Sequence, residues 1–222
     1  MTIALSTAIE PWTAARLRRL AATALHAVPV PDGDDGAGRP GPSDFDLDPD
    51  LALELAARHL RAAAVLVPIV DREQPTLLFT VRTDSLPSHA GQISFPGGKI
   101  DEGDAGPLDT ALREAEEEIG LARALVEPLG YLDTYRTGTG YAIQPVVALV
   151  DPGHSLAINP SEVAEVFEVP LAFLMQAANH QRHARAWQGR QRHFYAMPYG
   201  ERFIWGATAG IIRNLHQRLH AP

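Results

Sequence analysis

The chain has 222 residues, of which 45% are apolar, carries a formal net charge of -8 and contains no cysteine. This length and apolar content suffice for one well-cored domain with an extension. The lack of cysteine excludes a thiol nucleophile, a cysteine-ligated zinc site and a disulfide scaffold. The negative charge argues against a general nucleic-acid binder, because phosphate contacts require a basic face.

The sequence also gives no sign of a membrane segment. No stretch approaches the roughly eighteen uninterrupted apolar residues of a membrane span, and the first residues lack the long apolar core of a signal peptide. We therefore expect a cytoplasmic protein that does not act at a membrane. The sequence does not fix the oligomeric state, and a homodimer is compatible with it.

Residues 1–50 form an extension ahead of the main domain, which we expect to span residues 51–222. Apolar residues at helical spacing, with arginines between them, predict a short amphipathic helix over residues 13–27. This helix would pack on the domain or on a partner, and because it is basic and poor in acids an organelle-targeting presequence is the alternative. Residues 29–50 are rich in proline, glycine and aspartate, which predicts a flexible linker.

The main domain begins with segments of clear periodicity. Residues 51–64 have helical spacing, and the β-branched run over residues 64–70 predicts a buried strand. Residues 77–82 predict a second strand that delivers Arg82 to its end, where it is either an ordinary exposed charge or an anchor for phosphate. His89 follows, and we interpret it as a turn histidine that packs or hydrogen-bonds locally.

A helix over residues 107–119 is indicated by several independent signals. Pro107 suits the first helical position, Asp109 lies in the first turn, and Gly120 is placed to end the helix in the left-handed conformation. One face is apolar and is expected to be buried. Its members are Leu108, Ala111, Leu112, Ala115 and Ile119.

The other face of this helix carries Arg113 and the carboxylates of Glu114, Glu117 and Glu118. Like charges three and four residues apart destabilise a helix, and a divalent cation would neutralise them. Mg²⁺ takes carboxylate oxygens and is usually shared with substrate phosphates, so phosphate chemistry is indicated. A solvated acidic face is the alternative, but the preceding Gly97-Gly98 allows the backbone to approach a ligand closely.

The remainder of the chain alternates strands and helices irregularly, which favours a mixed sheet sandwiched by helices. Residues 129–135 and 141–150 predict a hairpin. Residues 160–170 alternate acids with apolar residues, as a half-buried strand does, and a helix is expected from about Leu171. Residues 180–193 suggest a variable surface segment. Paired strands over 194–199 and 202–205 and a closing helix over 208–220 complete the prediction.

The glycine, loop and acidic helix together resemble the signature of the Nudix hydrolases, over about residues 60–218. The residues that carry this resemblance are Gly98, Glu114, Glu117, Glu118 and Gly120. The chain departs from the family pattern at Ala105, where the usual spacing places a glutamate, and Asp104 stands one residue earlier. The role of that acid is therefore open.

A motif just upstream is similar to that of the coenzyme A pyrophosphatases within this family. Its matching residues are Arg82, His89, Gly91, Gln92 and Phe95-Pro-Gly-Gly98. The second arginine of that motif falls on Pro87 here, and the usual small residue after the first arginine is Thr83. The substrate is therefore less firmly indicated than the reaction.

The resemblance implies a Nudix-type α/β/α sandwich with a mixed sheet, preceded by an N-terminal helical extension. It implies Mg²⁺ or Mn²⁺ as cofactor, bound by Glu114, Glu118 and a backbone carbonyl near Gly98. Glu117 would be a further ligand or would orient the attacking water, and Arg113 would orient a glutamate. Outside the helix, Glu162 and Glu165 are the candidates for an acid or base.

The substrate that the upstream motif implies is coenzyme A, split into 4′-phosphopantetheine and adenosine 3′,5′-bisphosphate. Its 3′-phosphate needs a basic contact, for which Arg82 and Arg136 are candidates, while His89, Gly91 and Gln92 would contact other parts of the substrate. Two alternatives remain. The enzyme could hydrolyse ADP-ribose or a dinucleotide, or the chain could be a non-catalytic nucleotide-binding regulator.

Overall fold

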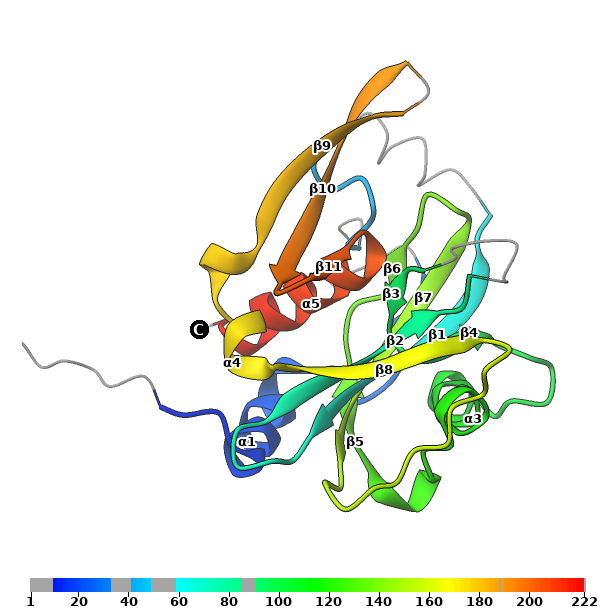
Figure 1. Ribbon diagram of the computed structural model, residues 1–222, viewed down its shortest axis with the longest axis vertical. Coiled ribbons are helices and arrows are strands. Elements are labelled where there is room, and N and C mark those ends of the chain that lie inside the picture. Colours follow the sequence, from blue (N-terminus) through cyan, green and yellow to red (C-terminus); the bar gives the residue numbers. More distant parts are fainter. Residues whose placement is uncertain (1–9, 33–40, 49–58, 85–90, 188, 222) are drawn as a thin grey trace, which may run out of the picture.

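The computed structural model describes residues 10–32, 41–48, 59–84, 91–187 and 189–221. Its main body is a mixed sheet in which β1 runs in parallel beside β7 and antiparallel to β2 (Figure 1). The long strands are β1 (Arg61–Val70), β2 (Thr76–Arg82), β7 (Tyr141–Val150) and β8 (Val163–Pro170). The shorter ones are β3 (Ile93–Ser94), β4 (Gly97–Lys99), β5 (Val126–Tyr131) and β6 (Tyr135–Arg136).

Helices cover both faces of this sheet. One face packs against α3, and the opposite face packs against α1 and α5 (Figure 1). The α-helices are α1 (Ala14–Ala24), α3 (Pro107–Ile119), α4 (Leu171–Leu174) and α5 (Ala207–Leu219). The described residues also form two 3₁₀ turns, η1 (Arg123–Leu125) and η2 (Ala177–Asn179). No described helix is long and apolar enough to cross a membrane.

The central strand shows why the sequence folds into these layers. Side chains alternate between the faces of a strand, and both faces of β1 are covered, so its sequence is almost continuously apolar. Leu66 packs into the cluster that contains Ala111 and Ile119 of α3. Val67 belongs to the opposite cluster, together with residues of α1 and α5. The predicted α/β sandwich with a mixed sheet is therefore confirmed.

A second, smaller sheet lies against the main body. It consists of β9 (Gln181–Trp187), β10 (Arg190–Tyr199) and β11 (Arg202–Trp205), paired antiparallel in the order β11-β10-β9. The hairpin of β9 and β10 extends away from the main sheet in Figure 1. The predicted pairing of strands around residues 194–199 and 202–205 is thus confirmed.

Most predicted elements form, with two differences. The expectation of a helix over residues 51–64 is wrong for residues 61–64, which already belong to β1 and pair with β7; residues 51–58 lie outside the described part. Helix propensity is overridden there by pairing with the neighbouring strand β7. The variable surface segment over 180–193 is instead largely the β9–β10 hairpin, which sequence periodicity misses because its exposed strands lack an apolar alternation.

The segment of residues 41–48, expected to be part of a flexible linker, is packed against the domain. Ser43 bridges to Arg136 of β6, and Phe45 is 4% exposed. Asp44 accepts hydrogen bonds from the Tyr135 hydroxyl at 3.1 Å and from the Gly138 backbone N–H at 2.9 Å. These contacts make the segment a structural part of the domain, and it is called the strap below.

Replacing Asp44 should destabilise the fold. In Asp44→Ala the buried Tyr135 hydroxyl loses its acceptor, which costs about 1–3 kcal/mol of unfolding free energy. Urea denaturation monitored by fluorescence would measure the loss. Glu73→Ala, which removes an exposed acid from a turn, is the matched control and should change stability by less than about 0.5 kcal/mol. Equal stability of the two variants would mean that the strap adds nothing to the fold.

Candidate active site

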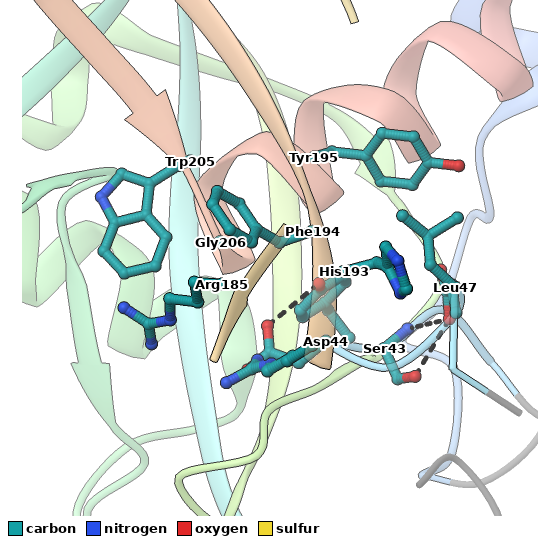
Figure 2. Close-up of a pocket in the computed structure, with 12 residues that line it drawn as sticks. Ser43, Asp44, Leu47, Arg185, His193, Phe194, Tyr195, Trp205 and Gly206 are labelled. Carbon is teal, nitrogen blue, oxygen red and sulfur yellow. Dashed lines mark hydrogen bonds and ion pairs between the residues drawn. The ribbon is translucent and has the colours of Figure 1, made fainter. Parts of the chain in front are cut away.

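The main cavity, with a volume of about 480 Å³, lies between the main sheet, the strap and the small sheet. This volume is in the range of small-molecule sites. At one end it is lined by Gly98, Glu114, Glu118 and Glu162, and at the other by Arg185, Arg192 and Trp205. A small hollow of about 20 Å³, drawn in Figure 2, adjoins the second end and shares several of its residues.

Gly97 and Gly98 line the end of the cavity that carries Glu114, Glu118 and Glu162, which is called the acidic end below. Gly97 and Gly98 pair with β1, and a Cβ added to Gly97 would come within 2.4 Å of the Ala64 carbonyl oxygen. A Cβ on Gly98 would lie 2.3 Å from the Glu114 carboxylate. Glycine is thus required at Gly97, where any side chain would push the backbone away from β1, whereas a side chain at Gly98 would displace the Glu114 carboxylate.

Three of the four glutamates of helix α3 were predicted as site residues, and they lie in three different environments. Glu118 is 3% exposed, the Glu114 side chain is 16% exposed, and that of Glu117 is 56% exposed. The expectation that all three point away from the buried face is therefore wrong for Glu118. It follows Glu114 by four residues and lies on the same side of the helix, which faces the cavity.

Arg113 organises the acids around it. Its guanidinium donates to both carboxylate oxygens of Asp104, at 2.9 and 3.0 Å, and also to Glu114 at 2.9 Å and Glu117 at 3.0 Å. The charge-assisted bonds from Arg113 hold the pKa of Asp104 well below its usual range, and Asp104 in turn raises the pKa of Arg113. The structural role of Asp104, left open by the sequence, is therefore to hold the Arg113 guanidinium in place through two hydrogen bonds.

Burial, together with the neighbouring charges, shifts the pKa values of the carboxylates at the acidic end. Burial, reinforced by the Glu114 charge, raises the pKa of Glu118 to about 8. Arg82 and the backbone N–H of Gly97 act in the opposite direction, and Glu162 adds further repulsion. Burial also raises the pKa of Glu114, against the stabilising bond from Arg113.

The donor set fits a hard divalent cation. Oε2 of Glu118 is buried and has no hydrogen-bond partner among the described residues, which leaves a carboxylate oxygen available beside Glu114. Within the described chain no group of three histidine or acidic side chains is close enough to enclose a metal. Mg²⁺ usually takes one or two carboxylates and completes its shell with water and substrate phosphate, so Glu114 and Glu118 suffice for a shared site.

The structure brings several other predicted site residues to the same cavity. Arg82, Gln92 and Glu162 line it, whereas Gly91 forms the adjacent turn, with its N–H donating to the Arg82 carbonyl. His89 lies outside the described residues. Glu165, the other candidate acid, instead forms an ion pair with Arg202.

Arg136 is another predicted substrate contact that does not line the cavity. Its side chain is 9% exposed and lies 3.1 Å from Asp32. Sequence reasoning missed Lys99, Asp44 and Arg185, which do line the cavity. No local signal marks them, because they come from three segments that only the tertiary fold brings together.

Comparison with models of known protein families identifies the family. The model of the NUDIX domain matches residues 59–188 of this chain. The chain belongs to the Nudix family. Membership assigns it to the hydrolases of nucleoside diphosphate derivatives, which generally use divalent metal cations.

Two relatives illustrate this Nudix assignment. A protein of Photorhabdus laumondii, described as an uncharacterized Nudix hydrolase NudL, is 44% identical over 159 residues, covering 72% of this chain and 85% of its own. A protein of the same description from Yersinia pestis is 43% identical over 159 residues, covering 72% and 80%. The Nudix domain of Shewanella oneidensis NrtR, solved with ADP-ribose, gives a TM-score of 0.47 at 21% identity, covering 74% and 91%.

The raised pKa of Glu118 predicts that the unfolding free energy of the metal-free protein falls as the pH rises. Its folded pKa of about 8 exceeds the ordinary 4.5, so the folded state holds a proton that the unfolded chain has lost, and stability falls as pH rises between these values. Glu118→Gln should therefore raise the unfolding free energy by on the order of 2 kcal/mol at pH 9 and by little at pH 4.

Urea denaturation in EDTA at both pH values would measure this difference. Glu117→Gln is the matched control, because that carboxylate is more than half exposed. A gain for Glu118→Gln that is the same at pH 4 and pH 9 would contradict the prediction.

Proposed function

We propose that this Nudix hydrolase splits the diphosphate of coenzyme A or an acyl-CoA, giving 4′-phosphopantetheine or its acyl form and adenosine 3′,5′-bisphosphate. The observation that carries the proposal is the shared cavity. Arg82 and Gln92, which belong to the coenzyme A motif, line it together with Glu114 and Glu118 of the Nudix helix. A diphosphate bound in this cavity would contact the positive charge of Arg82 and, at the same time, a cation held by Glu114 and Glu118.

Mg²⁺ or Mn²⁺ would be held by Glu114, Glu118 and the carbonyl region of Gly98. A divalent cation supplies, at such a site, neutralisation of diphosphate charge and activation of water. Arg113 keeps the Glu114 carboxylate oriented through its 2.9 Å bond, and Glu117 shares that arginine and is the candidate to orient the water. The buried Oε2 of Glu118, which has no partner among the residues described, supports this assignment.

The remaining groups act on the substrate. Arg82 donates to the diphosphate oxygens, where its fork of N–H groups suits phosphate, and Lys99 adds a second positive charge. Glu162 accepts a proton from the attacking water, whose oxygen bonds to one phosphorus as the bridging P–O bond breaks. The other phosphate leaves with the bridging oxygen, so no covalent enzyme intermediate is needed.

Product analysis tests the substrate. The purified protein would be incubated with coenzyme A, ADP-ribose or NADH in the presence of Mg²⁺ or Mn²⁺, and the products separated by chromatography. We expect adenosine 3′,5′-bisphosphate and 4′-phosphopantetheine from coenzyme A as the main reaction. Faster hydrolysis of ADP-ribose or NADH would replace the coenzyme A proposal with a different diphosphate substrate. No hydrolysis of any substrate would favour a non-catalytic binding role.

Removing either proposed metal-binding carboxylate should abolish turnover. Glu114→Gln and Glu118→Gln are each expected to lower kcat by at least about 100-fold, because each removes a charge that binds the cation. Turnover and the Mg²⁺ concentration giving half-maximal rate would be measured, with circular dichroism to confirm folding. Glu116→Gln, on the solvent side of the same helix, is the control and should retain normal turnover. Normal turnover in both site variants would remove the metal assignment.

Glu162 is expected to act as the base, in contrast to its neighbour Glu165. Glu162→Gln should lower kcat by about 100-fold or more with little change in KM, because general-base catalysis typically contributes that factor. Glu165→Gln loses only the exposed ion pair with Arg202 and should keep kcat within about twofold. Steady-state kinetics with the best substrate would measure both. A similar kcat for the two variants would assign the base elsewhere.

A further inference from the structure

The end of the cavity opposite the carboxylates is built around two arginines of the small sheet. Arg185 of β9 and Arg192 of β10 are direct cross-strand partners, and both line the cavity. Like charges placed directly opposite each other on paired strands are destabilising. This pair is therefore unfavourable unless an anion lies between or beside the two guanidinium groups.

Only one member of the pair has an acidic partner among the described ion pairs. Arg192 lies 3.1 Å from Asp44 of the strap, with 13% of its side chain exposed. Arg185 is not joined to a carboxylate in the described part of the chain, and its side chain is exposed toward the cavity. One positive charge at this end of the cavity is thus left uncompensated.

Aromatic rings fix the orientation of both guanidinium groups. The Arg185 guanidinium carbon lies 4.8 Å from the Trp205 ring centroid, and that of Arg192 lies 4.7 Å from the Phe45 ring centroid. Figure 2 shows Arg185 beside the Trp205 indole at the edge of the adjoining hollow. An arginine held on a ring loses less freedom when it binds an oxyanion, because its planar fork of donors is already oriented.

We propose that Arg185, with Arg192 beside it, forms a subsite for a phosphomonoester carried by the substrate at a distance from the diphosphate. In the proposed coenzyme A reaction, on which this inference rests, the group is the ribose 3′-phosphate. Trp205 acts as a positioning residue for Arg185. This subsite replaces Arg136, which does not line the cavity, as the proposed partner of the 3′-phosphate.

Comparing coenzyme A with dephospho-coenzyme A, which lacks only the 3′-phosphate, tests the subsite. Arg185→Gln should lower kcat/KM for coenzyme A by about 10- to 100-fold and for dephospho-coenzyme A by less than about threefold, the loss expected for one charged hydrogen bond. The control is Arg182→Gln, an exposed arginine three residues away on the opposite face of β9, which should change neither value. Equal losses of Arg185→Gln on both substrates would overturn the inference.

The positioning role of Trp205 gives a second test. Trp205→Leu removes the ring and should weaken the preference for coenzyme A over dephospho-coenzyme A by about tenfold, while Trp205→Phe should restore most of it. A purely structural role for Trp205 would lower activity on both substrates together. That result would remove the positioning role.

A binding measurement separates this inference from the proposed reaction. Calorimetric titration with adenosine 3′,5′-bisphosphate and with AMP requires no hydrolysis, and the intact protein should bind the bisphosphate at least about tenfold more tightly. Arg185→Gln should abolish that difference. If coenzyme A is not hydrolysed but the difference persists and depends on Arg185, the reaction is wrong and the subsite stands. If coenzyme A is hydrolysed but neither ligand nor substrate preference depends on Arg185, the reaction stands and the subsite is wrong.

Discussion

The candidate active site depends on the close approach of Gly98 to Glu114. Because no Cβ separates them, β4 can pair with β1 while α3 packs directly over it. The Glu114 carboxylate therefore lies directly over the backbone of β4. A methyl group at Gly98 would meet this carboxylate at 2.3 Å and displace it, so the position of Glu114 depends on the glycine below it.

Arg113 and Glu118, five residues apart on α3, lie in opposite electrostatic environments. Arg113 is surrounded by acceptors and is held by Asp104, Glu114 and Glu117. Glu118 is buried, and one of its oxygens has no partner within the part of the chain that the structure describes. The first arrangement stabilises the fold and orients Glu114, a proposed ligand of the cation. The second lowers stability and leaves a carboxylate oxygen available for that cation. Such contrasting environments for titratable groups are typical of catalytic sites.

Much of this arrangement could be predicted from local sequence. The bounds of α3, its apolar face and the run of β7 follow from spacing and terminal residues alone. The burial of Glu118 could not be predicted, because helical periodicity places it beside the apolar face without saying how far the cavity wall covers it. The β9–β10 hairpin was missed because its exposed strands lack an apolar alternation, although they are adjacent in sequence. The packed strap was missed because its partners are distant in sequence, as with Asp44 and Tyr135.

The strap has a consequence for how the cavity forms during synthesis of the chain. Asp44 bonds to partners 91 and 94 residues later, and its ion pair is made with Arg192, near the end of the chain. Contacts of such sequence separation close slowly, and β10 emerges from the ribosome after the main sheet is complete. The acidic end of the cavity can therefore assemble first, and the wall opposite it closes only once nearly the whole polypeptide has been made.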